Sequence, residues 1–349
     1  MDKVEEKIPV AILGATGSVG QKFIELLANH PWFKIIELCA SDKSAGKKYK
    51  DAVDWFLPSQ LPKIVGEILV QKCAPTLKSK VVFSGLNSSI AGEVETEFAK
   101  AGYKVISNSK NHRMDVDVPL LIPEVNPDHL ELIKTQSYRD GCIVTNPNCS
   151  VIGLVIALKP LLDNFGLEAV NVVTMQAISG AGHPRVVKLD IEDNVIPFIK
   201  GEESKVEIEP KKILGSVSHD KIIFNDFKVS AQCNRVNVRD GHTECVQVNL
   251  KKKASIDEII QSWESFKSTP QKMNLPLAPL QPIHYSYDEA FPQPKHHRDA
   301  DKGMAVSIGR LRKDSIFDYS FVILSHNTVR GAAGGAILCA ELMKAKGLI

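Results

Sequence analysis

One cysteine stands where a strand is expected to give way to a helix, and that position favours nucleophilic chemistry. In the segment TNPNCS the strand ends at Thr145, Pro147 bends the chain, and an apolar helix follows from Ser150. Cys149 therefore meets the free N–H groups and positive dipole end of a helix, which lower the pKa of a thiol and hold an oxyanion formed by attack on a carbonyl. We predict that Cys149 is a nucleophile. A buried, inert cysteine is the alternative, and it is our interpretation of the other six.

A nucleophilic thiol needs a proton partner, and His242 is the best placed of the ten histidines. An Asp-Gly dipeptide precedes it, which is typical of a two-residue hairpin and would pair His242 opposite Arg239. A cationic face beside a base predicts a site for an anionic substrate, whereas a solvated strand face is the alternative. Side-chain alternation puts these residues on one face: Arg235, Asn237, Arg239, His242 and Glu244.

A glycine-rich turn occupies residues 14–20, which read GATGSVG between an expected strand and an expected helix. Glycines permit a tight turn and a close approach of the backbone to phosphate, and the helix N-terminus then faces the pyrophosphate of a dinucleotide. The spacing is G-x-x-G-x-x-G rather than the usual G-x-G-x-x-G, so the pattern alone is a weak signal. Its place at the first strand–helix junction is what predicts a dinucleotide-binding loop. A plain tight turn is the alternative.

The residues after the second strand bear on the choice between NAD and NADP. Ser41 at the strand tip, with Lys43, Lys47 and Lys48 nearby, suits a 2′-phosphate, whereas an acidic residue there favours NAD. Asp42, an acidic residue next to Ser41, favours NAD instead. We predict NADP, with a solvated lysine-rich loop as the alternative.

The elements that must position these residues begin with alternating strands and helices. We expect buried strands at 10–13, 35–40, 81–84, 105–107 and 143–145, and helices at 21–29 and 92–101. This alternation predicts an α/β, Rossmann-type, doubly wound parallel sheet that binds a dinucleotide.

The pattern changes after Cys149. Longer strands at 170–177, 228–238, 242–250, 304–310 and 319–324 predict a second α+β domain with a mixed or antiparallel sheet. Residues 251–294 are rich in Lys, Ser and Pro and should wrap the surface, and 329–346 should form a helix that returns to the first domain. We therefore predict a dinucleotide-binding domain over 1–148, with 327–349 returning to it, and a catalytic and dimerisation domain over 149–326.

Composition excludes several other classes. Among 349 residues, 43 Lys and Arg balance 41 Asp and Glu for a net charge of +2, which excludes a strongly basic nucleic-acid binder. Seven cysteines without a C-x-x-C argue against a disulfide framework or a zinc site, so we expect no metal and a reducing compartment. The charged N-terminus lacks a signal-peptide core, and the longest apolar run, 151–158, is too short to span a bilayer. We expect a soluble, cytoplasmic protein.

Seven motifs spread over nearly the whole chain resemble one enzyme family. They resemble aspartate-β-semialdehyde dehydrogenase, in the branch typical of archaea, fungi and some bacteria. The motifs are 14–20, SNSKNHRMD at 107–115, NPNC at 146–149, QAISGAG at 176–182, GEESK at 201–205, Arg235 with Gly241-His242, and NTVRGAAG at 327–334.

The resemblance implies a reaction as well as a fold. The family reduces β-aspartyl phosphate to aspartate semialdehyde with NADPH in the biosynthesis of lysine, threonine and methionine. Cys149 would attack the acyl carbon, phosphate would leave, and NADPH would reduce the thioester, with His242 as the acid and base. The family forms dimers or tetramers, so we expect a homodimer or homotetramer with no nucleic-acid or membrane partner.

The resemblance also implies substrate contacts. Arg235 would clamp the α-carboxylate, Glu202 would meet the amine, and Gln176 would position the acyl group. The phosphate would be held by Arg113, Asn148 and Lys205. The cofactor positions implied are Gly14, Thr16, Gly17, Ser18, Val19, Ser41, Ser179, Gly180 and Asn327.

Some of these roles have alternatives. Glu203 adjoins Glu202 and leaves the register open, and both could be solvated. Arg113 could instead pair with Asp115 or Asp117.

Other activities share this chemistry. Malonyl-CoA reductase is the closest alternative, although that branch departs from Asn-Pro-Asn-Cys. N-acetyl-γ-glutamyl-phosphate reductase has a Gly-Cys-Tyr context, and glyceraldehyde-3-phosphate dehydrogenase lacks these motifs. A non-catalytic NADP-binding scaffold is disfavoured because Cys149, Gln176, Arg235 and His242 are all present.

Overall fold

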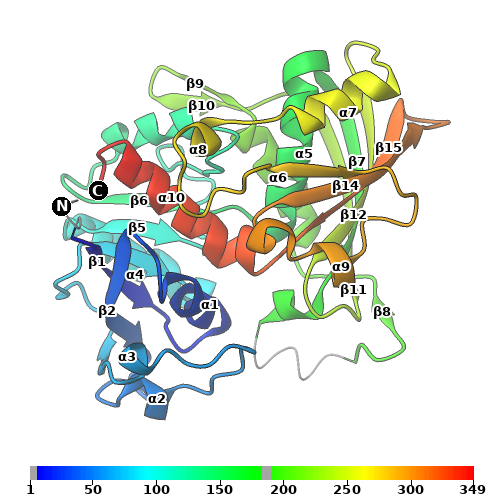
Figure 1. Cartoon of the computed structure of the whole chain (residues 1–349). Coiled ribbons are helices and arrows are strands. Elements are labelled where there is room, and N and C mark those ends of the chain that lie inside the picture. Colours follow the sequence, from blue (N-terminus) through cyan, green and yellow to red (C-terminus); the bar gives the residue numbers. More distant parts are fainter. Residues whose placement is uncertain (1–5, 183–189) are drawn as a thin grey trace, which may run out of the picture.

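A six-stranded parallel sheet forms the N-terminal part of the chain, drawn in blue to cyan in Figure 1. The computed structural model describes residues 6–182 and 190–349, so the first five residues of the N-terminal segment lie outside it. The strand order β3-β2-β1-β4-β5-β6 confirms the predicted doubly wound sheet. Its strands are β1 (Ile8–Leu13), β2 (Phe33–Ala40), β3 (Val70–Lys72), β4 (Val81–Ser84), β5 (Lys104–Ser107) and β6 (Cys142–Thr145).

Short helices connect these strands. The first begins at Ser18, earlier than predicted, because Gly17 already has the extended backbone of an N-cap. The fourth begins after Asn87, whose side chain accepts a hydrogen bond from the Ser89 N–H. The connecting helices are α1 (Ser18–Leu27), α2 (Tyr49–Ala52), α3 (Lys63–Gly66), α4 (Ser88–Lys100) and the 3₁₀ segment η1 (Pro127–Thr135).

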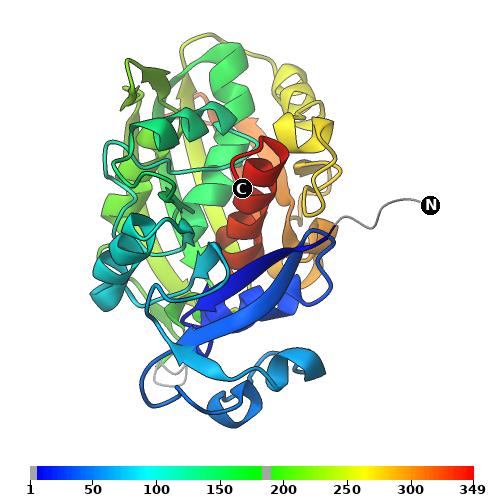
Figure 2. The ribbon, with the colours of Figure 1, turned by 90° about the vertical axis from the view of Figure 1, so that its left-hand side faces the viewer.

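The C-terminal helix packs against this first sheet. It follows a π-helical turn, η5 (Val329–Ala333), and continues as α10 (Gly334–Ala345), drawn in red in Figures 1 and 2. Ile337 of α10 is fully buried in the same apolar cluster as Val10 and Phe83. The domain boundaries at 148/149 and 326/327 stay a prediction.

A seven-stranded mixed sheet forms the second half, in the order β13-β14-β15-β12-β7-β11-β8, as predicted. Its strands are β7 (Leu167–Gln176), β8 (Val195–Ile196), β11 (Lys228–Val236), β12 (His242–Leu250), β13 (Ile283–Ser286), β14 (Val306–Lys313) and β15 (Tyr319–Ser325). A separate ribbon pairs β9 (Ser216–Ser218) with β10 (Lys221–Ile223). The other helical segments among the described residues are α5 (Cys149–Phe165), η2 (Ile178–Ala181), α6 (Glu202–Ile213), α7 (Ile256–Glu264), α8 (Thr269–Lys272), α9 (Pro294–His297) and η4 (Ala300–Gly303).

The predicted hairpin between β11 and β12 is wrong. Both strands pair with β7, β11 parallel and β12 antiparallel, so β7 lies between them. The Asp-Gly dipeptide does turn the chain, since Gly241 has φ +98°. The connection that contains it, however, passes the end of β7 to reach β12 on the other side of that strand. His242 therefore pairs with Ser325 of β15 rather than opposite Arg239.

The prediction that five residues around the Asp-Gly turn share one face of the sheet is confirmed for three of them and wrong for the other two. Arg235, His242 and Glu244 are buried on the same side of the sheet, because β7 pairs Gln176 with Arg235 and Thr174 with Glu244. Asn237 and Arg239 follow the end of β11 and are exposed. The alternative of a solvated face is therefore wrong for the three buried residues.

The segment 251–294 does more than wrap the surface. It contributes α7, whose Trp263 is fully buried, and β13, which pairs with β14. Because the segment is rich in Lys, Ser and Pro, the sequence did not predict α7, which begins with a capping box at Ser255 and Glu258. In the part of the chain that the structure describes, no helix has the length and apolar character needed to cross a membrane.

Candidate active site

The thiol of Cys149 lies at the first turn of α5, where the sequence predicted a helix start. Asn148 is the N-cap, and its side-chain oxygen accepts a hydrogen bond from the Ser150 N–H at 2.9 Å. The Cys149 Sγ lies 3.2 Å from the His242 Nε2. The predicted nucleophile and its predicted proton partner, far apart in sequence, thus meet at one helix terminus.

The imidazole of His242 is held in one tautomer. Its Nδ1 accepts a hydrogen bond from the Ala177 backbone N–H at 3.0 Å. Because Nδ1 accepts, we infer that the neutral ring carries its hydrogen on Nε2, the nitrogen that faces Cys149. The ring is therefore ready to donate a hydrogen to Sγ or to an oxygen bound beside it.

Burial keeps this pair neutral. Desolvation, followed by the Glu202 charge, raises the pKa of the Cys149 thiol to about 12, against the opposing charges of Arg235, Arg113 and Lys205. Desolvation and the Arg235 charge lower the pKa of His242 to about 3. The pKa of this thiol is therefore raised in the free enzyme, the opposite direction from the lowering that the helix terminus predicted, because desolvation and the Glu202 charge both disfavour the thiolate.

Two buried side chains, Arg235 and Gln176, lie on the same side of the sheet as His242. The Arg235 guanidinium donates from Nη1 to the Ala177 carbonyl at 2.7 Å, and Gln176 pairs with Arg235 in the sheet register. Gly180 passes over both functional groups: a Cβ there would lie 2.9 Å from Arg235 Nη1 and 3.2 Å from His242 Cε1. Only glycine lets this loop approach so closely.

Glu202 joins three predicted site residues. Its Oε1 accepts from the Asn148 Nδ2 at 2.8 Å and the Gln176 Nε2 at 3.2 Å, and its Oε2 from the Lys205 Nζ at 2.7 Å. Burial raises its pKa, but Lys205 and these hydrogen bonds lower it by more, so the carboxylate is ionised. Glu203 instead accepts from the Cys233 N–H, so Glu202 is the one of the two that contacts Asn148 and Gln176. At 5% exposed, Glu202 is not solvated.

Arg113 pairs with a residue that the sequence analysis did not select. Its Nη1 donates to the Glu209 Oε1 at 2.9 Å and its Nη2 to the Asn108 carbonyl at 3.0 Å. The alternative partners, Asp115 and Asp117, do not take this role. Glu209 lies seven residues after Glu202 on the same helix, and that spacing was the signal that could have found it.

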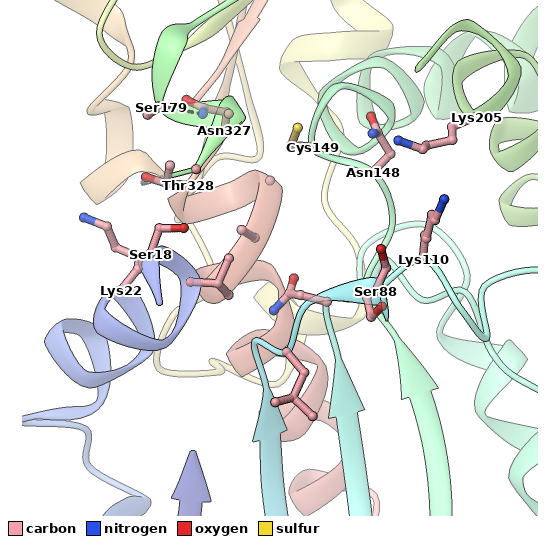
Figure 3. A pocket seen from close by; sticks show the side chains of 18 of the residues that line it. Ser18, Lys22, Ser88, Lys110, Asn148, Cys149, Ser179, Lys205, Asn327 and Thr328 are labelled. Carbon is pink, nitrogen blue, oxygen red and sulfur yellow. Dashed lines mark hydrogen bonds between the residues drawn. The ribbon is translucent and has the colours of Figure 1, made fainter. Parts of the chain in front are cut away.

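A cavity of about 310 Å³ opens beside the thiol. In Figure 3, Asn148, Lys205 and Lys110 lie on one side of Cys149, whereas Ser179, Asn327 and Ser18 lie on the other. Gln176, Glu202, Arg235 and His242 are buried and do not line this cavity. The predicted residues that do line it are Ser18, Val19, Arg113, Asn148, Cys149, Ser179, Gly180, Lys205 and Asn327.

A larger cavity of about 870 Å³ adjoins the first, because Ser18, Leu86 and Gly182 line both. The predicted positions that line it are Gly14, Thr16, Gly17, Ser18 and Ser41.

The glycine loop keeps its own backbone close to that cavity. Gly14 has φ +75°, and a Cβ on Gly20 would lie 2.3 Å from the Gly14 carbonyl oxygen. The loop thus brings bare backbone and the N-terminus of α1 to the cavity, which fits the phosphates of a dinucleotide.

The lysine that lines the larger cavity is not one that the sequence predicted. Lys43, Lys47 and Lys48 do not line the larger cavity, whereas Lys72 of β3 does and lies 3.2 Å from Asp42. Both side chains are mostly exposed, so this ion pair is screened by solvent and Asp42, which argued against NADP, keeps its charge. The described residues contain no group of three or more His, Cys, Asp or Glu that could hold a metal ion.

Two family models match the chain. Residues 9–133 match the model described as "Semialdehyde dehydrogenase, NAD binding domain", and residues 158–330 match "Semialdehyde dehydrogenase, dimerisation domain". The aspartate-semialdehyde dehydrogenase of Archaeoglobus fulgidus is 52% identical over 338 residues, which cover 96% of this chain and 97% of that protein.

Solved structures are similar over almost the full length. The crystal structure of aspartate semialdehyde dehydrogenase with NADP from Candida albicans has a TM-score of 0.91 at 44% identity, and covers 99% of this chain and 100% of its own. Aspartate semialdehyde dehydrogenase II of Vibrio cholerae, complexed with ASA, has a TM-score of 0.77 at 27% identity, and covers 98% of this chain and 99% of its own.

Proposed function

This chain belongs to the aspartate-semialdehyde dehydrogenase family, and we propose that it converts β-aspartyl phosphate, NADPH and a proton into aspartate semialdehyde, phosphate and NADP. One observation carries the proposal: the Cys149 Sγ lies 3.2 Å from the His242 Nε2 on the wall of a cavity that adjoins the glycine-loop cavity. A thiol, an acid–base group and a dinucleotide groove suit the reduction of an acyl group through a thioester.

The two cavities divide the cofactor between them. The glycine loop and Ser41 would hold the adenosine half, with the phosphates at the N-terminus of α1. Ser179, Gly180 and Asn327 would hold the nicotinamide half beside Cys149. The bound NADPH supplies a hydride to the acyl carbon.

Cys149 forms and releases the covalent intermediate. Its Sγ attacks the acyl carbon, the carbon–oxygen bond to phosphate breaks, and the thiol hydrogen leaves with the phosphate as hydrogen phosphate. After hydride transfer, the His242 Nε2–H donates a hydrogen bond to the oxyanion. The carbonyl re-forms as the carbon–sulfur bond breaks, and the leaving sulfur takes a proton from water. The Nε2–H tautomer suits this step, because the ring donates a hydrogen bond and keeps its own hydrogen.

The substrate charges match the groups around the thiol. Arg235 would take the α-carboxylate in a bidentate contact, and the ionised Glu202 would take the amine. Arg113, Asn148 and Lys205, which line the cavity, would hold the phosphate. Gln176, hydrogen-bonded to Glu202, would position the acyl group.

The proposal includes a homodimer or homotetramer in the cytoplasm. The description of the matched C-terminal model as a dimerisation domain supports the oligomer. The seven unpaired cysteines suit a reducing compartment.

The phosphate-dependent reverse reaction tests the proposal. Aspartate semialdehyde, phosphate and NADP are supplied to the wild type and to Cys149→Ala, and the NADPH absorbance is followed. We expect phosphate-dependent NADPH formation in the wild type and none in the variant. Equal rates would exclude Cys149 as the nucleophile.

A comparison of substrates tests the alternative activity, malonyl-CoA reduction. Malonyl-CoA reduction is not supported by the relatives described above, which are aspartate-semialdehyde dehydrogenases. No turnover of semialdehyde, together with NADPH oxidation by malonyl-CoA, would overturn the proposed substrate.

A further inference from the structure

Helix α6 presents charged as well as apolar residues to the protein interior. Glu202, Lys205, Glu209 and Lys212 follow one another at intervals of three and four residues, so they share one face of the helix. Glu202, Glu209 and Lys212 are 5%, 3% and 1% exposed, and buried charges need partners. Glu202 and Lys205, at the N-terminal end of this face, already have roles in the steps above, whereas Glu209 and Lys212 have none.

The Glu209 carboxylate connects two parts of the site that are distant in sequence. Its Oε1 accepts from the Arg113 Nη1 at 2.9 Å, and its Oε2 accepts from the Asn148 backbone N–H at 2.7 Å. Asn148 is the N-cap residue directly before Cys149. One buried carboxylate therefore links the guanidinium at the cavity wall to the start of the helix that carries the thiol.

Lys212, one turn further along α6, holds the loop that carries Arg113. Its Nζ donates to the carbonyl oxygens of Arg113 and Asp115, both at 2.7 Å, and of Val118 at 2.9 Å. Burial lowers its pKa to about 8, and the three carbonyls keep the ammonium form hydrogen-bonded at neutral pH. The backbone of this loop and the guanidinium of Arg113 are thus both attached to α6.

We propose that Glu209 is a positioning residue for the step in which Sγ attacks the acyl carbon and phosphate leaves, setting the Arg113 guanidinium relative to the Cys149 thiol through the Asn148 N–H. This inference rests on the proposed function, in which Arg113 takes the phosphate. Arg113 uses one hydrogen on each of Nη1 and Nη2 for Glu209 and Asn108, so further N–H groups remain for a ligand. The rigid bridge matters because the attacking sulfur and the departing phosphate must be aligned at the same carbon.

The variant Glu209→Gln tests the bridge with little change in shape. A glutamine side chain has one accepting oxygen and one donating NH₂, so either Arg113 or the Asn148 N–H would face a donor. In the phosphate-dependent reverse reaction we expect the KM for phosphate to rise about tenfold or more, the range for loss of a charge-assisted hydrogen bond. The KM values for NADP and semialdehyde should change little.

Glu207→Gln is the matched control. Glu207 lies on the same helix and accepts a hydrogen bond from the Ala231 backbone N–H at 3.2 Å, without contact to Arg113 or Asn148. We expect it to keep the wild-type KM for phosphate. Thermal unfolding of both variants separates a loss of stability from a loss of alignment.

A second variant keeps the proposal testable if Glu209→Gln does not fold. Glu209→Asp retains the charge but withdraws the carboxylate by one methylene, so it should also raise the KM for phosphate above that of the control. If a folded Glu209 variant has the same phosphate KM and kcat as Glu207→Gln, the positioning role is wrong. If the wild type itself shows no phosphate-dependent turnover, the proposed function fails instead.

Discussion

At the scale of single residues, the account depends on where two hydrogens lie. The Ala177 N–H occupies the His242 Nδ1, so the other ring nitrogen carries the hydrogen that faces the thiol. An imidazolium would place an N–H against the Ala177 N–H, and burial also disfavours its charge. The resting pair is therefore a neutral thiol beside a neutral imidazole, in contrast to a thiolate–imidazolium pair.

The first prediction concerns the pH dependence of thiol alkylation. The thiolate is the form that reacts, and desolvation raises the Cys149 pKa to about 12, above its ordinary value of 9.0. The thiolate fraction, and with it the rate of iodoacetamide labelling, should therefore keep rising roughly tenfold per pH unit from pH ~7 to pH ~9. Labelling is measured by peptide mass spectrometry on the free enzyme.

Cys149→Ser is the control, because it reports the labelling of the other cysteines. A rate that reaches a plateau at or below neutral pH would show a preformed thiolate. That result would contradict the neutral pair and the order of proton transfers derived from it.

At the scale of elements, local patterns predicted most of the first sheet. Strand β4 has the predicted bounds, and β1, β2, β5 and β6 differ by one or two residues at their N-terminal ends. Parallel strands buried on both faces read as short apolar runs, which is why they are visible in a single sequence. Strand β3 was missed because three residues, Val-Gln-Lys, form no pattern.

Long-range pairing was the part that the sequence did not reveal. The Asp-Gly turn predicted a hairpin, yet β7 lies between its two strands. The turn chemistry is local, whereas the insertion of β7 depends on contacts between residues 58 to 76 positions apart, such as Arg235 with Ala177 and Gln247 with Asn171. For the same reason the Glu209 bridge to Arg113, 96 residues away, was not predicted.

The second prediction belongs to the short strand β3. Lys72 lines the larger cavity, so Lys72→Met should remove a cation near the 2′-phosphate of NADP. Because Lys72 is exposed and its pairing with Asp42 is screened, we expect a moderate rise of about fivefold in the KM for NADP, with little change for NAD. Steady-state kinetics with both cofactors measure the ratio.

Lys43→Met is the matched control, since Lys43 does not line the cavity. If Lys43→Met raises the KM for NADP and Lys72→Met does not, the cation predicted from the sequence is the right one after all. Asp42→Asn should have the opposite effect to Lys72→Met, because it removes a negative charge near the phosphate.

At the scale of the whole molecule, one buried carboxyl group costs stability. Glu244 is 1% exposed, and neither of its carboxyl oxygens has a hydrogen-bond partner among residues 6–182 and 190–349. Desolvation, followed by the Glu202 charge, raises its pKa well above 4.5. The folded protein therefore keeps a proton on Glu244 that the unfolded chain releases above pH 4.5.

The third prediction follows from the sign of that difference. Above pH 4.5 the folded state binds more protons at Glu244 than the unfolded state, so the contribution of this residue to the free energy of unfolding falls as pH rises. Glu244→Gln removes the titration at similar volume. The variant should gain stability over the wild type by about 1.4 kcal/mol per pH unit, until the pKa of the folded state is reached.

Urea unfolding of both proteins at several pH values measures this gain. A stability difference that does not depend on pH would contradict the account, because it would mean that Glu244 titrates alike in both states. A loss of stability in Glu244→Gln that grows with pH would show that the carboxylate has a partner which stabilises its charge.

The central claim is that Cys149 carries the acyl group between the loss of phosphate and the arrival of the hydride. The most direct measurement incubates the wild-type enzyme with β-aspartyl phosphate in the absence of NADPH, followed by acid quenching and peptide mass spectrometry. We predict an aspartyl thioester on the peptide that contains Cys149, which disappears when NADPH is added before the quench. An enzyme that turns over but carries no adduct, or carries it on another residue, would contradict the claim.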